Sequence, residues 1–218
     1  MATLAQAIAG TARSLLKDKT GNPFGTRFDD SFFLDAVNDG QLEIVGLKYD
    51  AHTENVAHEL VAGTRQPLPS DAVAFLRLNR NLGLDGSTPG RTITSTTKAD
   101  LDSSDPYWHQ ARDIGEAIHY VFDDISEKYF YVYPATTGFV ELVYSQVPAR
   151  LTDLAQPITL LDIYAPSLIY YLVYRAYSVD MDDVVMQGKA QEFYSLFANS
   201  IGTKIQNELA TSPNEAPQ

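Results

Sequence analysis

The sequence predicts an α+β fold in which helices from the two ends of the chain form a bundle around an inserted, antiparallel β-rich region. Apolar residues recur every three or four positions near both ends, and glycine and proline punctuate residues 53–112. Residues 117–144 alternate in polarity, as β-strands do. The expected parts are an N-terminal helical pair at 1–52, a central β-rich region at 53–159, C-terminal helices at 160–209 and an extended tail at 210–218.

Two helices are expected in the N-terminal part. The first covers residues 3–16, where apolar side chains form a stripe, and a Gly-Asn-Pro segment at 21–23 follows it. The second runs over about 30–49. Asp29 or Asp30 is available as its N-cap, at the end where the helix dipole favours a negative charge.

The second helix contains a segment with two conflicting interpretations. Residues 38–40 read Asn-Asp-Gly, and an Asp-Gly step between apolar runs is a strong hairpin signal. The flanking apolar residues instead recur at steps of four, seven and three, as on one face of a helix: Phe33, Val37, Ile44 and Leu47. We favour the helix, in which Gly40 costs about 1 kcal/mol relative to alanine. That cost is most easily tolerated where another backbone approaches closely, so Gly40 is a predicted helix-packing residue.

Short strands are expected in the first half of the central region. Residues 54–62 fit either two helical turns or a strand, and we favour the strand because Val56, His58 and Leu60 alternate along it. A second strand is expected at 72–78, since its apolar residues fall on both faces. The subsequent elements are a loop at 83–90 and a threonine-rich segment at 92–96 that pairs back across it.

The second half of the central region carries the clearest β pattern. Three runs at 118–122, 129–133 and 139–144 are separated by turns and predict an antiparallel meander. The middle run places three tyrosines on one face and two apolar residues on the other: Tyr129, Tyr131 and Tyr133 against Phe130 and Val132. Such a tyrosine row could stack sugar rings, but it is more typical of a core or a subunit interface.

Helices return in the C-terminal part. Residues 162–178 are apolar on nearly all sides, which predicts a helix buried among others, with Pro166 in its first turn. The final helix, near 181–209, has apolar residues at strict four-residue steps: Phe193, Phe197, Ile201, Ile205 and Leu209. The last nine residues have no apolar face and are predicted to be disordered in the isolated chain: Ala210, Thr211, Ser212, Pro213, Asn214, Glu215, Ala216, Pro217 and Gln218.

Composition and charge narrow the function classes. The 218 residues have no apolar run near the roughly 18 residues of a membrane-spanning helix, and the N-terminus lacks the features of a signal peptide. We therefore expect no membrane partner and assembly in a cytoplasm. The 28 acidic residues outnumber the 16 basic ones, which argues against tight binding of nucleic acid. An acidic channel wall is compatible with passage of DNA without binding, and the alternative is that the charge only keeps a monomer soluble.

Catalytic and metal-binding patterns are weak. The sequence lacks a Gly-x-Ser-x-Gly elbow, a His-Glu-x-x-His pair, a Walker loop and cysteine, so no cofactor or metal is expected. His52 and His58 are poorly spaced for ligation, and His109 and His119 are better suited to packing or hydrogen bonding. Acid pairs leave a glycosidase-type mechanism open: Asp100 and Asp102, Asp123 and Asp124, and Asp182 and Asp183.

Several segments in order along the chain resemble one protein family. Besides Leu34-x-x-x-Asn38-Asp39-Gly40-Gln41-x-Glu43-Ile44-Val45, they are residues 60–69, Asn81 with 85–91, 105–109, 119–123, 131–134, 140–144 and 163–178. This pattern resembles the head-to-tail adaptor, or connector, proteins of short-tailed, podovirus-type bacteriophages. The resemblance covers nearly the whole chain and contains no catalytic motif.

The resemblance implies a non-enzymatic virion protein of the tail or neck, assembled in the host cytoplasm. It implies a ring of twelve copies that binds the phage portal protein, docks the tail nozzle protein and extends the DNA channel. The tail at 210–218 is then the candidate portal-docking arm, and Tyr129, Tyr131 and Tyr133 are candidates for a subunit or nozzle interface. A carbohydrate-binding or wall-degrading tail component and another connector ring, such as a stopper, are the alternatives.

Overall fold

The computed structural model describes residues 3–18, 27–110, 115–122, 128–180 and 183–211. The chain divides into two compact units. One unit combines Met1–Ala51 with Pro148–Gln218, and we call it the helical unit. The other, His52–Val147, contains every strand of the described residues, and we call it the β unit. The α+β class predicted from the sequence is confirmed.

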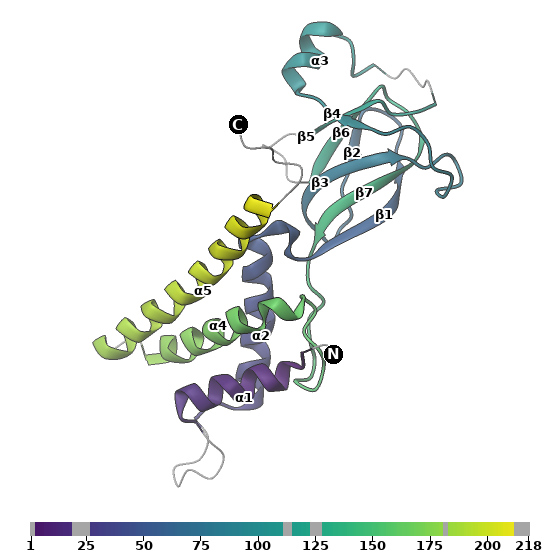
Figure 1. The fold of residues 1–218 in the computed structure, drawn as a ribbon. Coiled ribbons are helices and arrows are strands. Elements are labelled where there is room, and N and C mark those ends of the chain that lie inside the picture. Colours follow the sequence, from purple (N-terminus) through teal and green to yellow (C-terminus); the bar gives the residue numbers. More distant parts are fainter. Residues whose placement is uncertain (1–2, 19–26, 111–114, 123–127, 181–182, 212–218) are drawn as a thin grey trace. The chain divides into compact units, whose positions relative to one another are not determined.

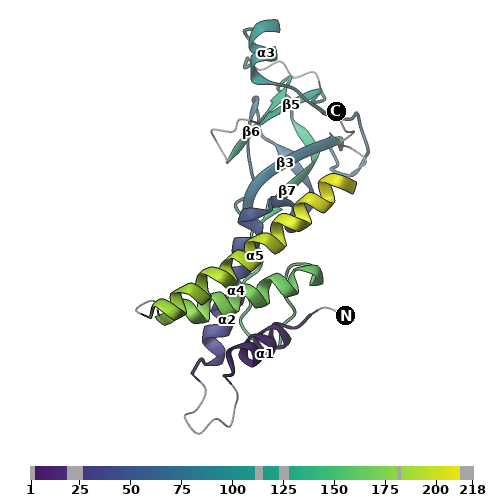
Figure 2. The same ribbon diagram turned by 60° about the vertical axis from the view of Figure 1, so that its left-hand side comes forward.

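The helical unit is built around α4 (Ala165–Tyr177), on which α1 (Ala5–Leu16), α2 (Asp30–Leu47) and α5 (Val184–Thr211) all pack (Figures 1 and 2). The described part of this unit also has the 3-10 turns η1 (Tyr49–Ala51), η2 (Asp162–Tyr164) and η3 (Ser178–Asp180). Asp29 is the N-cap of α2, where its side chain accepts a hydrogen bond from Phe32 N at 2.9 Å. Pro166 lies in the first turn of α4, where its missing N–H breaks no helical hydrogen bond.

The helical interpretation of residues 38–40 is confirmed, because α2 runs through them without a break. Most of the predicted apolar face of α2 is buried, but Leu47 at its C-terminal end is 46% exposed, so the burial of this face does not extend to the last residue of the helix. At the other end of the unit, α5 continues through Thr211. The first two residues assigned to the extended tail, Ala210 and Thr211, are therefore helical, and 212–218 lie outside the described residues.

The described residues of the β unit form two sheets. The first has the order β1-β7-β3, and the second has the order β2-β6-β5-β4. Their strands are β1 (Thr53–Leu60), β2 (Arg65–Pro67), β3 (Ala72–Asn81), β4 (Thr94–Ser95), β5 (His119–Phe122), β6 (Tyr129–Tyr133) and β7 (Gly138–Gln146). A short helix, α3 (Lys98–Ser104), has Thr97 as its N-cap, and the Thr97 hydroxyl accepts a hydrogen bond from Asp100 N.

The predicted meander was wrong in one connection. β5 and β6 pair antiparallel as expected, but β7 leaves them and becomes the central strand of the other sheet, between β1 and β3. Pro134 follows β6 directly and has no N–H with which to continue a ladder. The 92–96 segment also pairs in two ways, since Thr92 bridges Arg80 while β4 lies parallel to β5.

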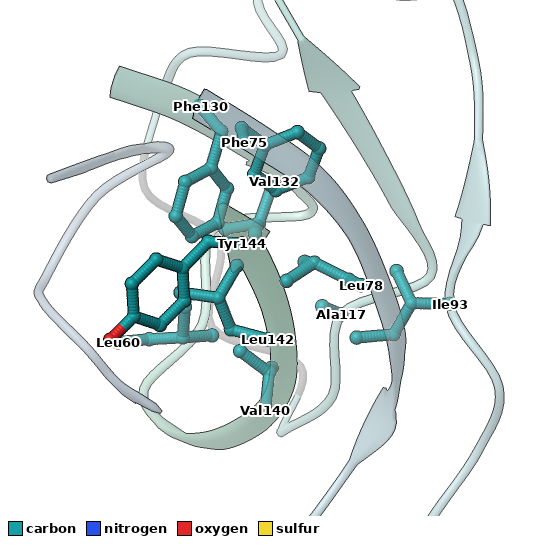
Figure 3. Packing of buried hydrophobic residues seen from close by; sticks show 10 residues of the cluster. All are labelled: Leu60, Phe75, Leu78, Ile93, Ala117, Phe130, Val132, Val140, Leu142 and Tyr144. Carbon is teal, nitrogen blue, oxygen red and sulfur yellow. The ribbon is translucent and has the colours of Figure 1, made fainter. Parts of the chain in front are cut away.

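Both sheets contribute to one core (Figure 3). Phe130 and Val132 of β6 are fully buried there, and the Phe130 ring stacks on Phe75 of β3 with ring centroids 5.1 Å apart. The members of the cluster are Leu60, Phe75, Leu78, Ile93, Ala117, Phe130, Val132, Val140, Leu142 and Tyr144. The predicted alternation along β6 therefore holds, with its apolar face inward and its tyrosine face half-buried on the other side.

Candidate functional site

The segment 38–41, which carries the Asn-Asp-Gly-Gln motif, makes long-range contacts at every position. Asn38 is buried, and its side chain pairs with the backbone of Leu151 as a neighbouring strand would. The amide Nδ2 donates to Leu151 O at 3.0 Å, and Oδ1 accepts from Leu151 N at 2.8 Å. One side chain thus satisfies both backbone polar groups of a residue in the connector between β7 and η2.

Gln41 holds the same connector one helical turn further along α2. It is 1% exposed, and its Oε1 accepts hydrogen bonds from Thr159 N at 2.7 Å and Leu160 N at 3.3 Å. The start of α1 adds backbone bonds, from Ala5 N to Gln156 O and from Ile158 N to Thr3 O. The connector has no helix or strand to satisfy its own backbone, so these contacts from α1 and α2 take that place.

The two middle residues of the motif face α4. Asp39 pairs with the guanidinium of Arg175 at 2.8 Å, in a position where both side chains are more than a third exposed. A Cβ at Gly40 would lie 2.9 Å from both Leu168 Cδ2 and Tyr171 Cδ1. Close packing explains Gly40, but the prediction of an approaching backbone was wrong, because the approaching groups are side chains.

A buried lysine ties the two long helices together at their C-terminal ends. Lys48, whose side chain is 4% exposed, forms ion pairs with Asp50 and, at 2.6 Å, with Glu208 of α5. Burial lowers the pKa of Lys48, but the hydrogen bonds with these two carboxylates outweigh burial and raise it above its usual value. The ion pair between Lys48 and Glu208 holds the C-terminal part of α5 against the C-terminal end of α2.

The tyrosine row is occupied by contacts within the β unit. Tyr131 packs edge-on against Trp108, and Trp108 stacks on His109 with ring centroids 3.6 Å apart. The Tyr133 ring lies parallel to that of His119, and the guanidinium of Arg65 lies 3.7 Å from the ring centre of Tyr129. Tyr131 and Tyr133 pack against a second, smaller core of Leu101, Trp108 and Val121, and Tyr129 is covered on one side by Arg65, so the row is not an open stacking platform.

The candidate carboxylates also have structural partners. Asp100 accepts from the Thr97 hydroxyl at 2.6 Å, and Asp102 accepts from Trp108 Nε1 at 2.8 Å. Asp183 caps the first turn of α5 by accepting from Val185 N at 2.8 Å. Asp123, Asp124 and Asp182 lie outside the described residues.

The histidines show no shared site. His109 and His119 hydrogen-bond through Nδ1 to the hydroxyls of Thr64 and Thr94, at 3.0 and 2.8 Å. Within the described part of the chain, no group of three or more His, Asp or Glu side chains could hold a metal ion. His58 stands apart because it is half-buried beside the Phe130 ring, and burial lowers its pKa below 6.5.

The lowered pKa of His58 predicts a loss of stability in acid. The unfolded chain takes up this proton at its ordinary pKa of 6.5, before the folded protein does. The contribution of neutral His58 is therefore complete above pH 6.5 and is lost as pH falls from 6.5 through the lower pKa of the folded state. Urea unfolding of the wild type and of His58→Leu from about pH 8 to about pH 5 should show the wild type losing more stability. A constant difference between the two would contradict the assignment.

Two further buried amides, which the sequence placed in segments resembling the adaptor family but gave no structural role, organise the β unit. Asn81 donates to Arg91 O and Ala117 O and accepts from Ala117 N, and so joins β3 to the segment before β5. Gln66 bonds both the N–H and the C=O of Val61. Asparagine and glutamine inside otherwise apolar segments were the available signal.

Within the described residues, the side chains of the 38–41 motif serve packing and hydrogen bonding in the helical unit, as expected of a structural component. The family comparison agrees: the family model of the SU10 adaptor protein matches residues 2–217, and the chain belongs to that family. It is a family of phage head–tail adaptors, which makes the chain a bacteriophage structural component. No curated protein is significantly similar in sequence. Among the described helices, none is long and apolar enough to span a membrane.

Proposed function

We propose that the protein is the head-to-tail adaptor of a short-tailed phage, forming a ring of twelve copies under the portal. The ring extends the DNA channel and docks the tail nozzle. The observation that carries this proposal is the family match, which spans nearly the entire chain and therefore includes both units. The fold contributes a helical unit in which the 38–41 motif of the N-terminal part bonds the connector that leads into the C-terminal helices.

Exposed apolar side chains support a role for the helical unit as the ring wall. Val184 and Val185 at the start of α5 are 80% and 63% exposed, and Leu161 and Ile163 before α4 are 69% and 60% exposed. Apolar groups of this size are costly to leave in water when several occur in one unit, and contact with neighbouring subunits removes the cost. The β unit is then the part available to the nozzle.

The charge balance supports a conduit that does not hold DNA. The chain has a net charge of −12, and acidic side chains that face the channel repel the phosphates of DNA. A wall that neutralised phosphates would slow the passage of the genome. We therefore expect DNA to pass through the ring without specific binding.

The direct test is to mix the purified protein with the portal from the same phage and to count subunits by electron microscopy. A twelvefold collar on the portal is the expected result. A protein that stays monomeric and ignores the portal would overturn the proposal. It would direct attention to a tail-tip or wall-directed role.

The C-terminal segment gives a second prediction. We propose that residues 210–218 dock the portal, with the first helix as the second choice. Because α5 runs through Thr211, truncation after Thr211 should leave the helix whole while removing the arm. Portal binding is expected to fall by roughly tenfold or more, with helical circular dichroism unchanged. Unchanged binding would exclude residues 212–218 from docking.

A further inference from the structure

β1 forms one outer edge of its sheet and is unusually regular. All eight of its residues pair with β7 in one uninterrupted register, from Thr53 opposite Ser145 to Leu60 opposite Gly138. The hydrogen bond from Gln146 N to His52 O at 3.0 Å shows which residues of this ladder exchange backbone hydrogen bonds. Even-numbered residues of β1 therefore bond β7, and the odd-numbered residues turn their N–H and C=O groups away from it. The outward-facing residues are Thr53, Asn55, Ala57 and Glu59.

The outward groups of β1 have no hydrogen-bond partner within the described residues. One position beyond the strand, the partner is a side chain: Gln66 accepts from Val61 N at 2.7 Å and donates to Val61 O at 2.8 Å. This amide occupies the place of an adjacent strand at the end of β1. The four outward-facing residues before it remain open, and all four are exposed.

The opposite edge of the same sheet is protected. The pairing of β3 with β7 has three register shifts, which twist and interrupt an edge. The last part of β3 is also covered, by bonds from Ile93 N to Asn79 O and from Asn81 N to Arg91 O. β1 has neither a register shift nor a proline, and such an edge is a template for another strand.

We propose that an extended segment of another tail protein, carrying lysine or arginine, adds to β1 as a further antiparallel or parallel strand. This inference rests on the proposed adaptor function for the existence of such a partner. The backbone groups supply the bonds, and half-buried Val56 at the margin of the core offers an apolar contact.

The charges along β1 select the partner. Its ionised side chains are Glu54 and Glu59, and it carries no lysine or arginine. A second copy of this chain would bring four carboxylates and no base into one short ribbon, and each copy has a net charge of −12. A basic segment is attracted to the same edge and gains cross-strand ion pairs.

Ala57→Pro tests the edge without touching the ladder to β7. Proline removes the outward N–H of residue 57, and an edge strand tolerates proline at such a position. Ala57→Thr keeps the N–H and is the matched control. Each variant is titrated separately with the purified portal and with the purified nozzle protein of the same phage. The nozzle protein is expected to bind wild type and Ala57→Thr alike and Ala57→Pro roughly tenfold more weakly, with unchanged circular dichroism. The portal is expected to bind all three alike, and a loss of portal binding instead would overturn the choice of a tail protein as the occupant.

If proline distorts β1, a charge variant and a hydrogen-exchange measurement still test the strand addition. Glu54→Lys/Glu59→Lys should weaken the same binding and remove its salt dependence. Hydrogen–deuterium exchange of residues 53–60 should be slower in purified phage tails than in the free protein. Equal exchange in the two states, or equal binding by all variants, overturns the strand addition.

The adaptor function and the strand addition at β1 are overturned by different results. Wild type that binds neither portal nor nozzle overturns the adaptor function, while exchange at β1 in the tails still decides the strand addition. Self-association of the wild type that Ala57→Pro abolishes would make the occupant a second copy and overturn the charge argument. A ring that forms normally with β1 unprotected leaves the adaptor function standing and removes the inferred strand.

Discussion

Replacing Gly40 with leucine is expected to lower the free energy of unfolding of the helical unit by about 3 kcal/mol. A Cβ alone would lie 2.9 Å from Leu168 Cδ2 and Tyr171 Cδ1. Neither neighbour has room to retreat, because Leu168 is fully buried and the Tyr171 ring packs against Phe197 with centroids 5.1 Å apart. The longer leucine side chain must therefore displace α4 or force strained rotamers, and either change outweighs the gain in helix propensity.

Gly10 in the middle of α1 is the matched control. A Cβ there would have no neighbour within 4 Å, and the residue is exposed. Gly10→Leu should therefore stabilise the unit by about 0.7 kcal/mol through helix propensity alone. Urea unfolding followed by circular dichroism at 222 nm separates the two signs. Equal effects at the two positions would show that crowding at Gly40 is unimportant.

The sequence predicted the helical elements because their signals are local. The spacing around Gly40 outweighed the hairpin signal of Asn-Asp-Gly, and the structure has a continuous α2 there. The sequence could not reveal the hydrogen-bond partners of Asn38 and Gln41. Those partners lie more than a hundred positions away, in a connector without periodicity. The strand partner of β7 was missed for the same reason, since alternation identifies a strand but not its neighbour.

The candidate interface was predicted only in part. Alternation along β6 correctly separated its tyrosines from Phe130 and Val132, but it gave no sign of what covers the tyrosine face. That cover includes Trp108 and the short helix α3, in a region where we expected only strands and turns. A signal was present, because Thr97 and Asp100 have the spacing of a capping box. The tyrosines therefore act within the β unit, and their role toward other chains stays a prediction.

Asn38→Ala is expected to cost about 3 kcal/mol of stability, although alanine is the better helix former. The substitution removes both partners of the Leu151 backbone, and Leu151 is only 7% exposed, so water cannot readily replace them. A buried N–H and a buried C=O would each be left unsatisfied, at about 1 to 3 kcal/mol apiece. The connector would be freed at one end while Gln41 still holds the other.

Asp39→Ala, one position along the same helix, is the control for this prediction. It removes the ion pair with Arg175, in which both side chains are more than a third exposed, and should cost less than about 1 kcal/mol. Asn38→Asp should resemble Asn38→Ala, because it keeps the acceptor for Leu151 N but places a carboxylate against Leu151 O. Urea midpoints measure all three variants. If Asn38→Ala costs no more than Asp39→Ala, the pairing with Leu151 does not hold the connector, and the 38–41 motif must act chiefly through Gly40 and Gln41.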